Sequence, residues 1–450
     1  MNWKDIYKQK LITIEEAATK IKSHDRVNYT PCASAPVDII NAITRRYKEL
    51  EGVTLTTGLI LAPFEYLKPN YIGHIRHHSL FMGPIERKFM PFGNVEVTSY
   101  HFSETEWMVR NRVKPNVFIA EVSEPDEDGN MSFGPVGTHW GRICAEMAET
   151  VIVQVNREVP YVYGEKKDAF INVKDVNWIC EGDHKIPELP NPPLSEIDKS
   201  IASHIVGRIK NGSTIQLGVG GVANAVGYFL ENHKDLGVHT EMMVDSMVTL
   251  FEKGVITNAK KTLHPGEMAV GFGIGSEKLY RFMHRNPAVK TYPNSYICDP
   301  NVVGRNANFV SINSSLMCDL TGQACSESLG FEQFSGTGGQ LDFVRGAKLS
   351  EGGQSFIAFP STAKLKDGTL TSRVCVTLPP GTVVSTPRSD AQYFVTEYGV
   401  ADVKGKSIVE RAHELVKIAH PDFREQLSQQ ARELGLLPKK AAVVASGIAQ

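Results

Sequence analysis

The stretch Gly218-Val219-Gly220-Gly221-Val222 decides how the second part of this chain folds. It stands between residues 214–217, which read as a strand, and a run whose Val222, Ala225, Val226, Phe229 and Leu230 recur at helical spacing. A glycine loop between a strand and a helix exposes backbone N–H groups at the helix N-terminus, where anions bind. The stretch therefore predicts an α/β unit with a site for a phosphate-bearing group, although a plain tight turn is the simpler interpretation.

Glu241 is the second feature, 23 residues after Gly218. It ends a predicted strand at 237–241 and precedes apolar residues. A carboxylate in that setting usually has an ion-pair partner or a functional role. It could be a salt-bridged rim residue, a covalent nucleophile, or the ribose-binding acid of a dinucleotide site in which Ala223 replaces the third glycine of GxGxxG.

A second glycine-rich turn covers residues 335–340. Glycine lacks a Cβ, so Gly339 can bring a backbone N–H close to a reacting carbonyl. The alternative is an ordinary flexible loop.

The order helix, strand, turn, helix, strand occurs twice, once from Thr13 and again from Ser195. Both starts have the spacing of a helix cap. The repeat predicts two related α/β halves, with the glycine loop and Glu241 in the second half alone. Residues 185–194 carry four prolines and form the predicted linker, which divides the chain into domains 1–190 and 191–450.

Two later elements are also predicted. Residues 311–320 read as one buried strand. Residues 408–419 carry an amphipathic helical pattern that Pro421 should stop.

Composition excludes several classes of function. The 450 residues carry a formal net charge of −2, so no basic field recruits nucleic acid or a membrane surface. The seven cysteines are scattered singly without a CxxC pair, which argues against disulfides and a metal site and for a cytoplasmic location. There is no P-loop motif and no GxSxG elbow.

Taken as a set, six motifs resemble the acetyl-CoA hydrolase/transferase family of class I CoA-transferases, in particular its 4-hydroxybutyrate CoA-transferase and butyryl-CoA:acetate CoA-transferase branch. The resemblance spans nearly the whole chain. It implies two related open α/β CoA-transferase domains with the active site in the cleft between them. The motifs are residues 125–129, 218–222, 236–242, 326–330, 338–343 and 396–401.

The resemblance also implies roles for individual residues. Glu241 matches the catalytic glutamate that forms a glutamyl-CoA thioester, and Gly339 matches an oxyanion donor that lines the thioester. The CoA-binding residues it implies are Gly218, Val219, Gly220, Gly221, Val222, Leu316 and Gly339. One departure is Asn224, where many relatives have proline.

The implied reaction is ping-pong transfer of CoA from butyryl-, 4-hydroxybutyryl- or acetyl-CoA to a carboxylate such as acetate. CoA is then a substrate, and no metal or permanently bound cofactor is expected. Residues 57–63 of the first half should cover the acyl group. A homodimer or homotetramer is usual for such relatives. The alternatives are an acyl-CoA hydrolase using the same glutamate, an NAD-dependent dehydrogenase, and a non-catalytic CoA- or nucleotide-binding protein.

Overall fold

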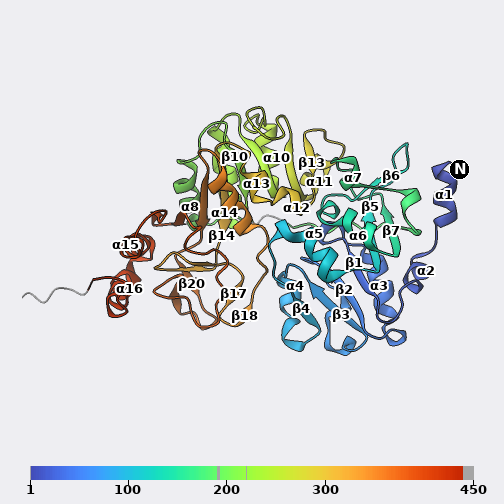
Figure 1. Ribbon diagram of the computed structural model, residues 1–450, viewed down its shortest axis with the longest axis horizontal. Coiled ribbons are helices and arrows are strands. Elements are labelled where there is room, and N and C mark those ends of the chain that lie inside the picture. Colours follow the sequence, from blue (N-terminus) through green and yellow to red (C-terminus); the bar gives the residue numbers. More distant parts are fainter. Residues whose placement is uncertain (1, 190–192, 219, 439–450) are drawn as a thin grey trace, which may run out of the picture.

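The computed structural model describes residues 2–189, 193–218 and 220–438. Two α/β halves lie side by side, with the first in blue to teal and the second in green to orange, and a helical pair closes the C-terminal end (Figure 1). Each half is built on one large sheet whose central strands are buried on both faces, as parallel strands covered by helices usually are.

The sheet of the first half has the order β4-β3-β2-β1-β5-β7-β9 with parallel pairing throughout. Its strands are β1 (Arg26–Tyr29), β2 (Val53–Thr57), β3 (Ile75–Ser79), β4 (Val95–Val97), β5 (Val117–Val122), β7 (Thr150–Asn156) and β9 (Trp178–Gly182).

The sheet of the second half has the order β13-β12-β11-β10-β14-β19-β23-β24, in which β24 alone is antiparallel to its neighbour. Its strands are β10 (Thr214–Leu217), β11 (Gly237–Met243), β12 (Met268–Gly273), β13 (Val289–Thr291), β14 (Phe309–Ser314), β19 (Gln354–Ala358), β23 (Tyr393–Thr396) and β24 (Gly399–Asp402).

The two sheets share one topology. In each, the first strand of the half is central, the next three strands extend to one side and the later strands to the other. The predicted repeat of two related halves is therefore confirmed. The strand order reverses between β1 and β5 in the first sheet and between β10 and β14 in the second. In open α/β sheets ligands bind at the carboxyl ends of strands at such a reversal, and the glycine loop directly follows β10.

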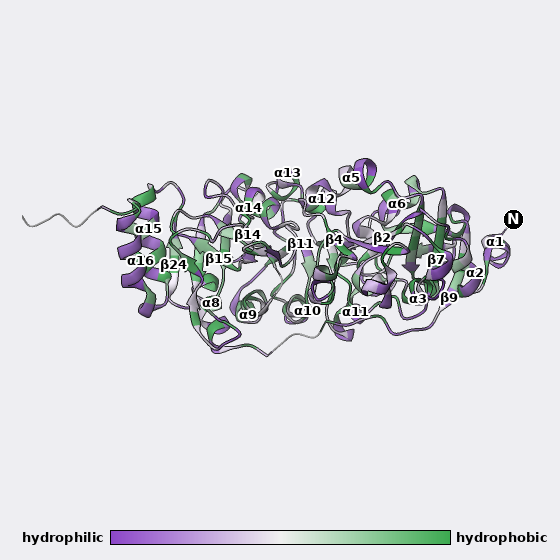
Figure 2. Ribbon diagram, turned by 90° about the horizontal axis from the view of Figure 1, so that it is seen from below, coloured by the Kyte–Doolittle hydropathy of each residue, from purple (hydrophilic) through white to green (hydrophobic). Residues whose placement is uncertain are grey.

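Helices cover both faces of the sheets. Figure 2 shows α3, α8, α9, α10 and α11 along one face, and α5, α6, α12, α13 and α14 along the other. The helices of the first half are α1 (Trp3–Lys10), α2 (Ile14–Thr19), α3 (Val37–Arg45), α4 (Pro84–Arg87), α5 (Thr105–Met108), α6 (Gly141–Met147) and α7 (Lys166–Ala169). Those of the second half are α8 (Glu196–Val206), α9 (Gly221–Phe229), α10 (Asp245–Glu252), α11 (Glu277–Met283), α12 (Asn294–Ile297), α13 (Pro300–Val303), α14 (Gln340–Leu349), α15 (Ile408–Ile418) and α16 (Pro421–Glu433).

Short strands form four small sheets beside the main ones. They are β6 (Asn130–Ser132), β8 (Phe170–Asn172), β15 (Met317–Asp319), β16 (Ala324–Cys325), β17 (Ser328–Leu329), β18 (Glu332–Gln333), β20 (Thr362–Lys364), β21 (Leu370–Ser372) and β22 (Val374–Cys375).

Local signals placed several elements correctly. The predicted caps at Thr13 and Ser195 are both capping boxes that begin α2 and α8. In α9, however, Phe229 is 39% exposed. The buried stripe runs through Val222, Val226 and Leu230, four residues apart, so the neighbouring Phe229 points off that stripe.

Two later predictions need correction. Residues 311–320 are two strands, because β14 belongs to the main sheet while β15 leaves it to pair with β16 and β22. Pro421 follows the end of α15 as expected, but it also occupies the first turn of α16, a helix that the sequence analysis missed. Proline suits that position because its missing N–H needs no partner there.

Between β9 and α8, residues 183–189 and 193–195 form no helix or strand, and the predicted linker residues 190–192 lie outside the described residues. All seven cysteines are free thiols. Across the described residues, no helix combines the length and the apolar character needed to cross a membrane.

Candidate active site

Glu241 lies within β11, two residues before its end, rather than at the strand terminus that the sequence predicted. The residue is half-buried. Its Oε2 atom accepts a hydrogen bond from the backbone N–H of Gly339 at 2.8 Å. The Sγ atom of Cys298 lies 3.9 Å from the same oxygen. The tertiary structure thus brings the two predicted catalytic residues, 98 positions apart, into direct contact.

The environment of Glu241 raises the pKa of its carboxyl group to about 8. Burial is the main cause and the charge of Asp342 adds to it, while the Gly339 N–H and the Cys298 thiol favour the ionised form and oppose the rise. A carboxylate that ionises against such a penalty is poorly solvated and has few partners. It is therefore a better nucleophile than an ordinary surface glutamate, and perturbed groups of this kind are typical of active sites.

Position 339 requires glycine because there is no room for a side chain, and not because of its backbone conformation. Its φ of −92° suits any residue. A Cβ at this position would lie closer than 3.0 Å to Glu241 Oε2 and 3.2 Å from both Cys298 Sγ and Phe343 Cε2. Gly339 also caps the N-terminus of α14, where unpaired N–H groups and the helix dipole favour negative charge. The predicted oxyanion donor therefore has the right geometry for its role.

The first glycine loop lies at the reversal between β10 and β14. The Gly218 N–H donates to the carbonyl of Ile312 at 2.8 Å, which continues the β10–β14 ladder. Gly220 caps α9 with a φ of +116°, a conformation that side chains rarely adopt. Gly221 packs against α8, since a Cβ there would come within 2.8 Å of Asp198 Oδ2.

The remaining predicted CoA contacts differ in character. Val219 lies outside the described residues. Val222 is 4% exposed, so its side chain belongs to the core. Leu316 is half-buried, and it lies in the turn between β14 and β15 rather than in the predicted strand, with its N–H bonded to the carbonyl of Cys325 at 2.8 Å. The preceding Ser314 reaches the glycine loop, because its Oγ atom is 3.7 Å from the Cβ position of Gly220.

The first half faces the second glycine turn through an aromatic side chain. The ring of Phe81 lies 3.1 Å from the Cβ position of Gly338 and 3.3 Å from that of Gly336. Gly58 lies behind Phe81, and the Leu59 N–H donates to the Phe81 carbonyl at 2.6 Å. Gly58 and Leu59, in the predicted segment 57–63, therefore support Phe81, which contacts the turn directly. Their predicted contact with an acyl group stays a prediction.

A segment that the sequence analysis missed also reaches this turn. The Phe102 N–H donates to the Gly338 carbonyl at 3.1 Å. The Ser99 hydroxyl lies 2.5 Å from Glu327 Oε2 and 2.7 Å from the Thr337 hydroxyl. The run of aromatic residues 100–102 after β4 could have drawn attention to the segment, but nothing in the sequence names its partners.

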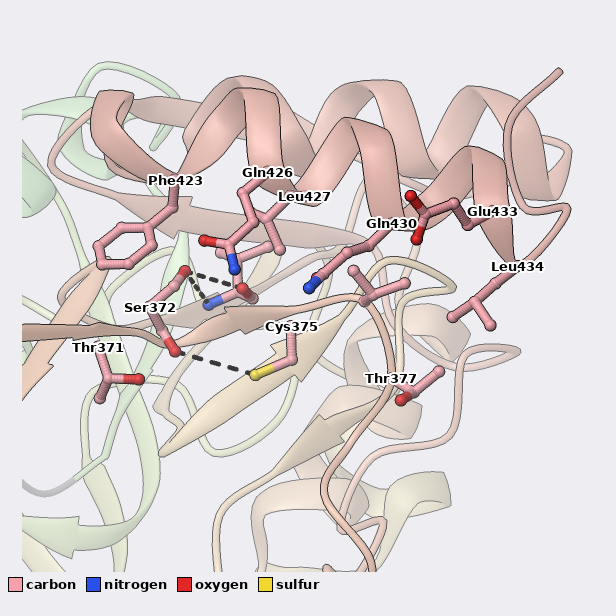
Figure 3. Close-up of a pocket in the computed structure, with 12 residues that line it drawn as sticks. Thr371, Ser372, Cys375, Thr377, Phe423, Gln426, Leu427, Gln430, Glu433 and Leu434 are labelled. Atoms are coloured by element: carbon pink, nitrogen blue, oxygen red, sulfur yellow. Dashed lines mark hydrogen bonds between the residues drawn. The ribbon is translucent and has the colours of Figure 1, made fainter. Parts of the chain in front are cut away.

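An open cavity of about 520 Å³ lies elsewhere, between the β21–β22 segment and α16. Figure 3 shows Thr371, Ser372 and Cys375 on one side of it and Phe423 and Leu427 of α16 on the other. Neither Glu241 nor Gly339 lines it. The candidate active site is therefore identified by its contacts rather than by the volume of a cavity.

Comparison with known proteins shows the family of the chain. Residues 1–189 match the acetyl-CoA hydrolase/transferase N-terminal domain and residues 275–431 match the corresponding C-terminal domain. The glycine loop and Glu241 lie between the two matched ranges.

Among similar proteins, the 4-hydroxybutyrate coenzyme A transferase of Clostridium kluyveri is 42% identical over 96% of this chain and 100% of its own length. The butyryl-CoA:acetate CoA-transferase of Anaerostipes caccae is 39% identical over 96% and 98%. The crystal structure of RipA from Yersinia pestis superimposes with a TM-score of 0.92 at 33% identity, covering 97% of this chain and 100% of that one. The chain therefore belongs to the acetyl-CoA hydrolase/transferase family.

Proposed function

We propose that this protein is a CoA-transferase that moves CoA from a short-chain acyl-CoA to a carboxylate such as acetate, with Glu241 as the covalent nucleophile. The contact between the Glu241 carboxylate and the Gly339 N–H carries the proposal, because it joins a nucleophile and an oxyanion donor in one half-buried site. The close relatives named above act on 4-hydroxybutyrate, butyrate and acetate by their names. Butyryl-, 4-hydroxybutyryl- and acetyl-CoA are the candidate donors.

The first stage moves the acyl group onto the enzyme. A Glu241 carboxylate oxygen attacks the thioester carbonyl, the C–S bond breaks, and CoA leaves as a thiolate beside a mixed anhydride. The thiolate then attacks the glutamyl carbonyl, the C–O bond of the anhydride breaks, and the first carboxylate departs. Glu241 is left as a glutamyl-CoA thioester.

The second stage runs the same steps in reverse with the incoming carboxylate. Each step exchanges one activated acyl bond for another, so the chemistry needs neither ATP nor a metal. In the free enzyme the Gly339 N–H binds Glu241 Oε2. When the glutamyl carbon becomes tetrahedral, the same N–H lies beside the oxyanion that forms on it. Such a donor contributes about 2.7–4 kcal/mol.

The glycine loop is the proposed site for the CoA phosphates. Gly220 and Gly221 begin α9 at the strand reversal, so backbone N–H groups at a helix N-terminus face the carboxyl ends of the strands. We place Gly218 and Leu316 beside the same CoA. Family membership favours this interpretation of the loop over a dinucleotide site.

Transfer requires that the anhydride and the thioester react with a carboxylate before water does. Phe81 covers the Gly336 and Gly338 positions, the buried Phe102 packs against Phe81, and the buried Tyr100 packs against Phe102. This apolar wall restricts water and favours transfer over hydrolysis. We further propose a cytoplasmic homodimer or homotetramer without a permanently bound cofactor, and size-exclusion chromatography with light scattering measures the assembly.

Borohydride trapping tests the covalent step. The protein is incubated with butyryl-CoA and then reduced, and peptide mass spectrometry should find the reduced glutamyl group at Glu241 and nowhere else. Glu241→Gln is the matched control and should show no trapping and no transfer. Normal transfer by Glu241→Ala would refute the proposal. Thiol release without any carboxylate acceptor, at the rate seen with acetate, would assign a hydrolase instead.

A further inference from the structure

Asp342 links the two halves of the protein next to the candidate active site. It lies in the first turn of α14 and is 4% exposed. Its Oδ1 atom accepts from the Ser103 hydroxyl at 2.8 Å, and its Oδ2 atom accepts from the Ser103 backbone N–H at 3.0 Å. Both oxygens of this buried carboxylate thus accept hydrogen bonds from a single residue, Ser103, of the other half.

The location of this link gives it a role in the site. Asp342 follows Gly339 by three residues, and the adjacent Gly338 carbonyl accepts from the Phe102 N–H at 3.1 Å. Residues 102 and 103 therefore hold the chain on both sides of the Gly339 N–H. These two contacts with the first half fix the position of the Gly339 N–H that binds Glu241.

The charges around Asp342 come from several elements. His101 and Glu104 of the first half interact electrostatically with it, and so do Glu241 and Cys298 of the second half. Burial raises the pKa of Asp342 to about 6, against the two Ser103 hydrogen bonds and His101, while Glu104 adds to the rise. The Asp342 carboxyl therefore ionises at lower pH than that of Glu241, and its charge contributes to the raised pKa of Glu241.

We propose that Asp342 is a positioning residue of the transfer reaction, which locks the Gly339 donor in place and holds a second negative charge beside the nucleophile. The inference rests on the function proposed above. An ionised Glu241 is repelled by Asp342, whereas an acylated Glu241 is neutral and is not. The charge therefore raises the free energy of the free carboxylate relative to the anhydride and the thioester, and it favours formation of the covalent intermediate.

The test is the pH profile of kcat/KM for butyryl-CoA with Asp342→Asn, which removes the charge at nearly constant volume. The acid limb of this profile is the fall of kcat/KM at low pH as Glu241 is protonated. It should move to lower pH by about 1 unit, the scale on which neighbouring carboxyl groups couple. The amount of borohydride-trapped glutamyl thioester at equilibrium should fall. The matched control is Glu104→Gln, which removes an exposed charge next to Ser103 and should leave the acid limb in place.

An acid limb at the wild-type position in Asp342→Asn would overturn the charge role of Asp342, and an unchanged kcat at the pH optimum would overturn its role in holding the Gly339 donor. Circular dichroism checks the fold, and Asp342→Ser removes the same charge if Asp342→Asn does not fold. The two proposals fail in different ways. Absence of trapping in the wild-type protein refutes the CoA-transferase mechanism, whereas trapping in the wild type with an unmoved limb in the variant refutes the role of Asp342 alone.

Discussion

Replacement of Gly339 by alanine is the sharpest test of the site geometry. The φ of −92° and ψ of 6° are open to alanine, so the backbone should keep its course. The added Cβ would lie closer than 3.0 Å to Glu241 Oε2, whereas carbon atoms in contact settle at about 3.5–4.0 Å. The Glu241 carboxylate must therefore retreat by at least about half an ångström, because Cys298 and Phe343 crowd the Cβ from the other sides.

Two losses follow from that retreat. The hydrogen bond from the Gly339 N–H to Glu241 Oε2 lengthens from 2.8 Å to roughly 3.3 Å or more and is weakened, and complete loss of one oxyanion donor costs about 10²–10³ in kcat. Misplacement of a reacting group by about 1 Å costs a further factor of about 10² at most. We therefore expect Gly339→Ala to lower kcat by about 10²-fold, with a smaller effect on KM for butyryl-CoA because the glycine loop at residues 218–222 is unchanged.

The assay is transfer from butyryl-CoA to acetate, followed by chromatography of the CoA esters. The matched control is Gly336→Ala in the same turn. Its Cβ would lie 3.3 Å from the Phe81 ring and 3.5 Å or more from backbone atoms of Phe81 and Leu80, so the change should cost less than about tenfold. Thermal unfolding of both variants should stay close to that of the wild type. Activity of Gly339→Ala equal to that of Gly336→Ala would refute the assignment of Gly339 as the donor.

Two further predictions concern the neighbours and the ionisation of Glu241. Cys298→Ala removes the weak thiol donor to Glu241, so the pKa of the glutamate should rise further and kcat/KM below pH 8 should fall by about 2–10-fold, as a pH profile would show; an unchanged acid limb would exclude the contact. The folded pKa of Glu241, about 8, is above its ordinary value of 4.5, so the folded protein binds the extra proton and loses stability as the pH rises between these values. Glu241→Gln should consequently be more stable than the wild type by roughly 1–2 kcal/mol above pH 8 and equal to it below pH 4.5, after allowance for partial solvent access. Urea unfolding at both pH values measures the difference, and a variant that is less stable at high pH would contradict it.

Periodicity and cap residues were sufficient for part of the fold. The strand at 214–217, the helix caps at Thr13 and Ser195, and the repeat of two halves depend on signals that are local in the chain. The family resemblance pointed to Glu241, Gly339 and the glycine loop as candidates. Local signals failed where a chain segment changes partner, as at Leu316, where the strand leaves one sheet for another.

The sequence by itself therefore determined the α/β architecture and the repeat through short-range patterns, and it pointed to Glu241 as the candidate nucleophile through the family resemblance of its motifs. Only the tertiary structure decided that the Gly339 N–H meets Glu241 at 2.8 Å and that Asp342 is bound by Ser103. These contacts join residues 98 and 239 positions apart. Such pairs are set by how two sheets and their loops pack against each other, and no periodicity within either segment encodes that packing.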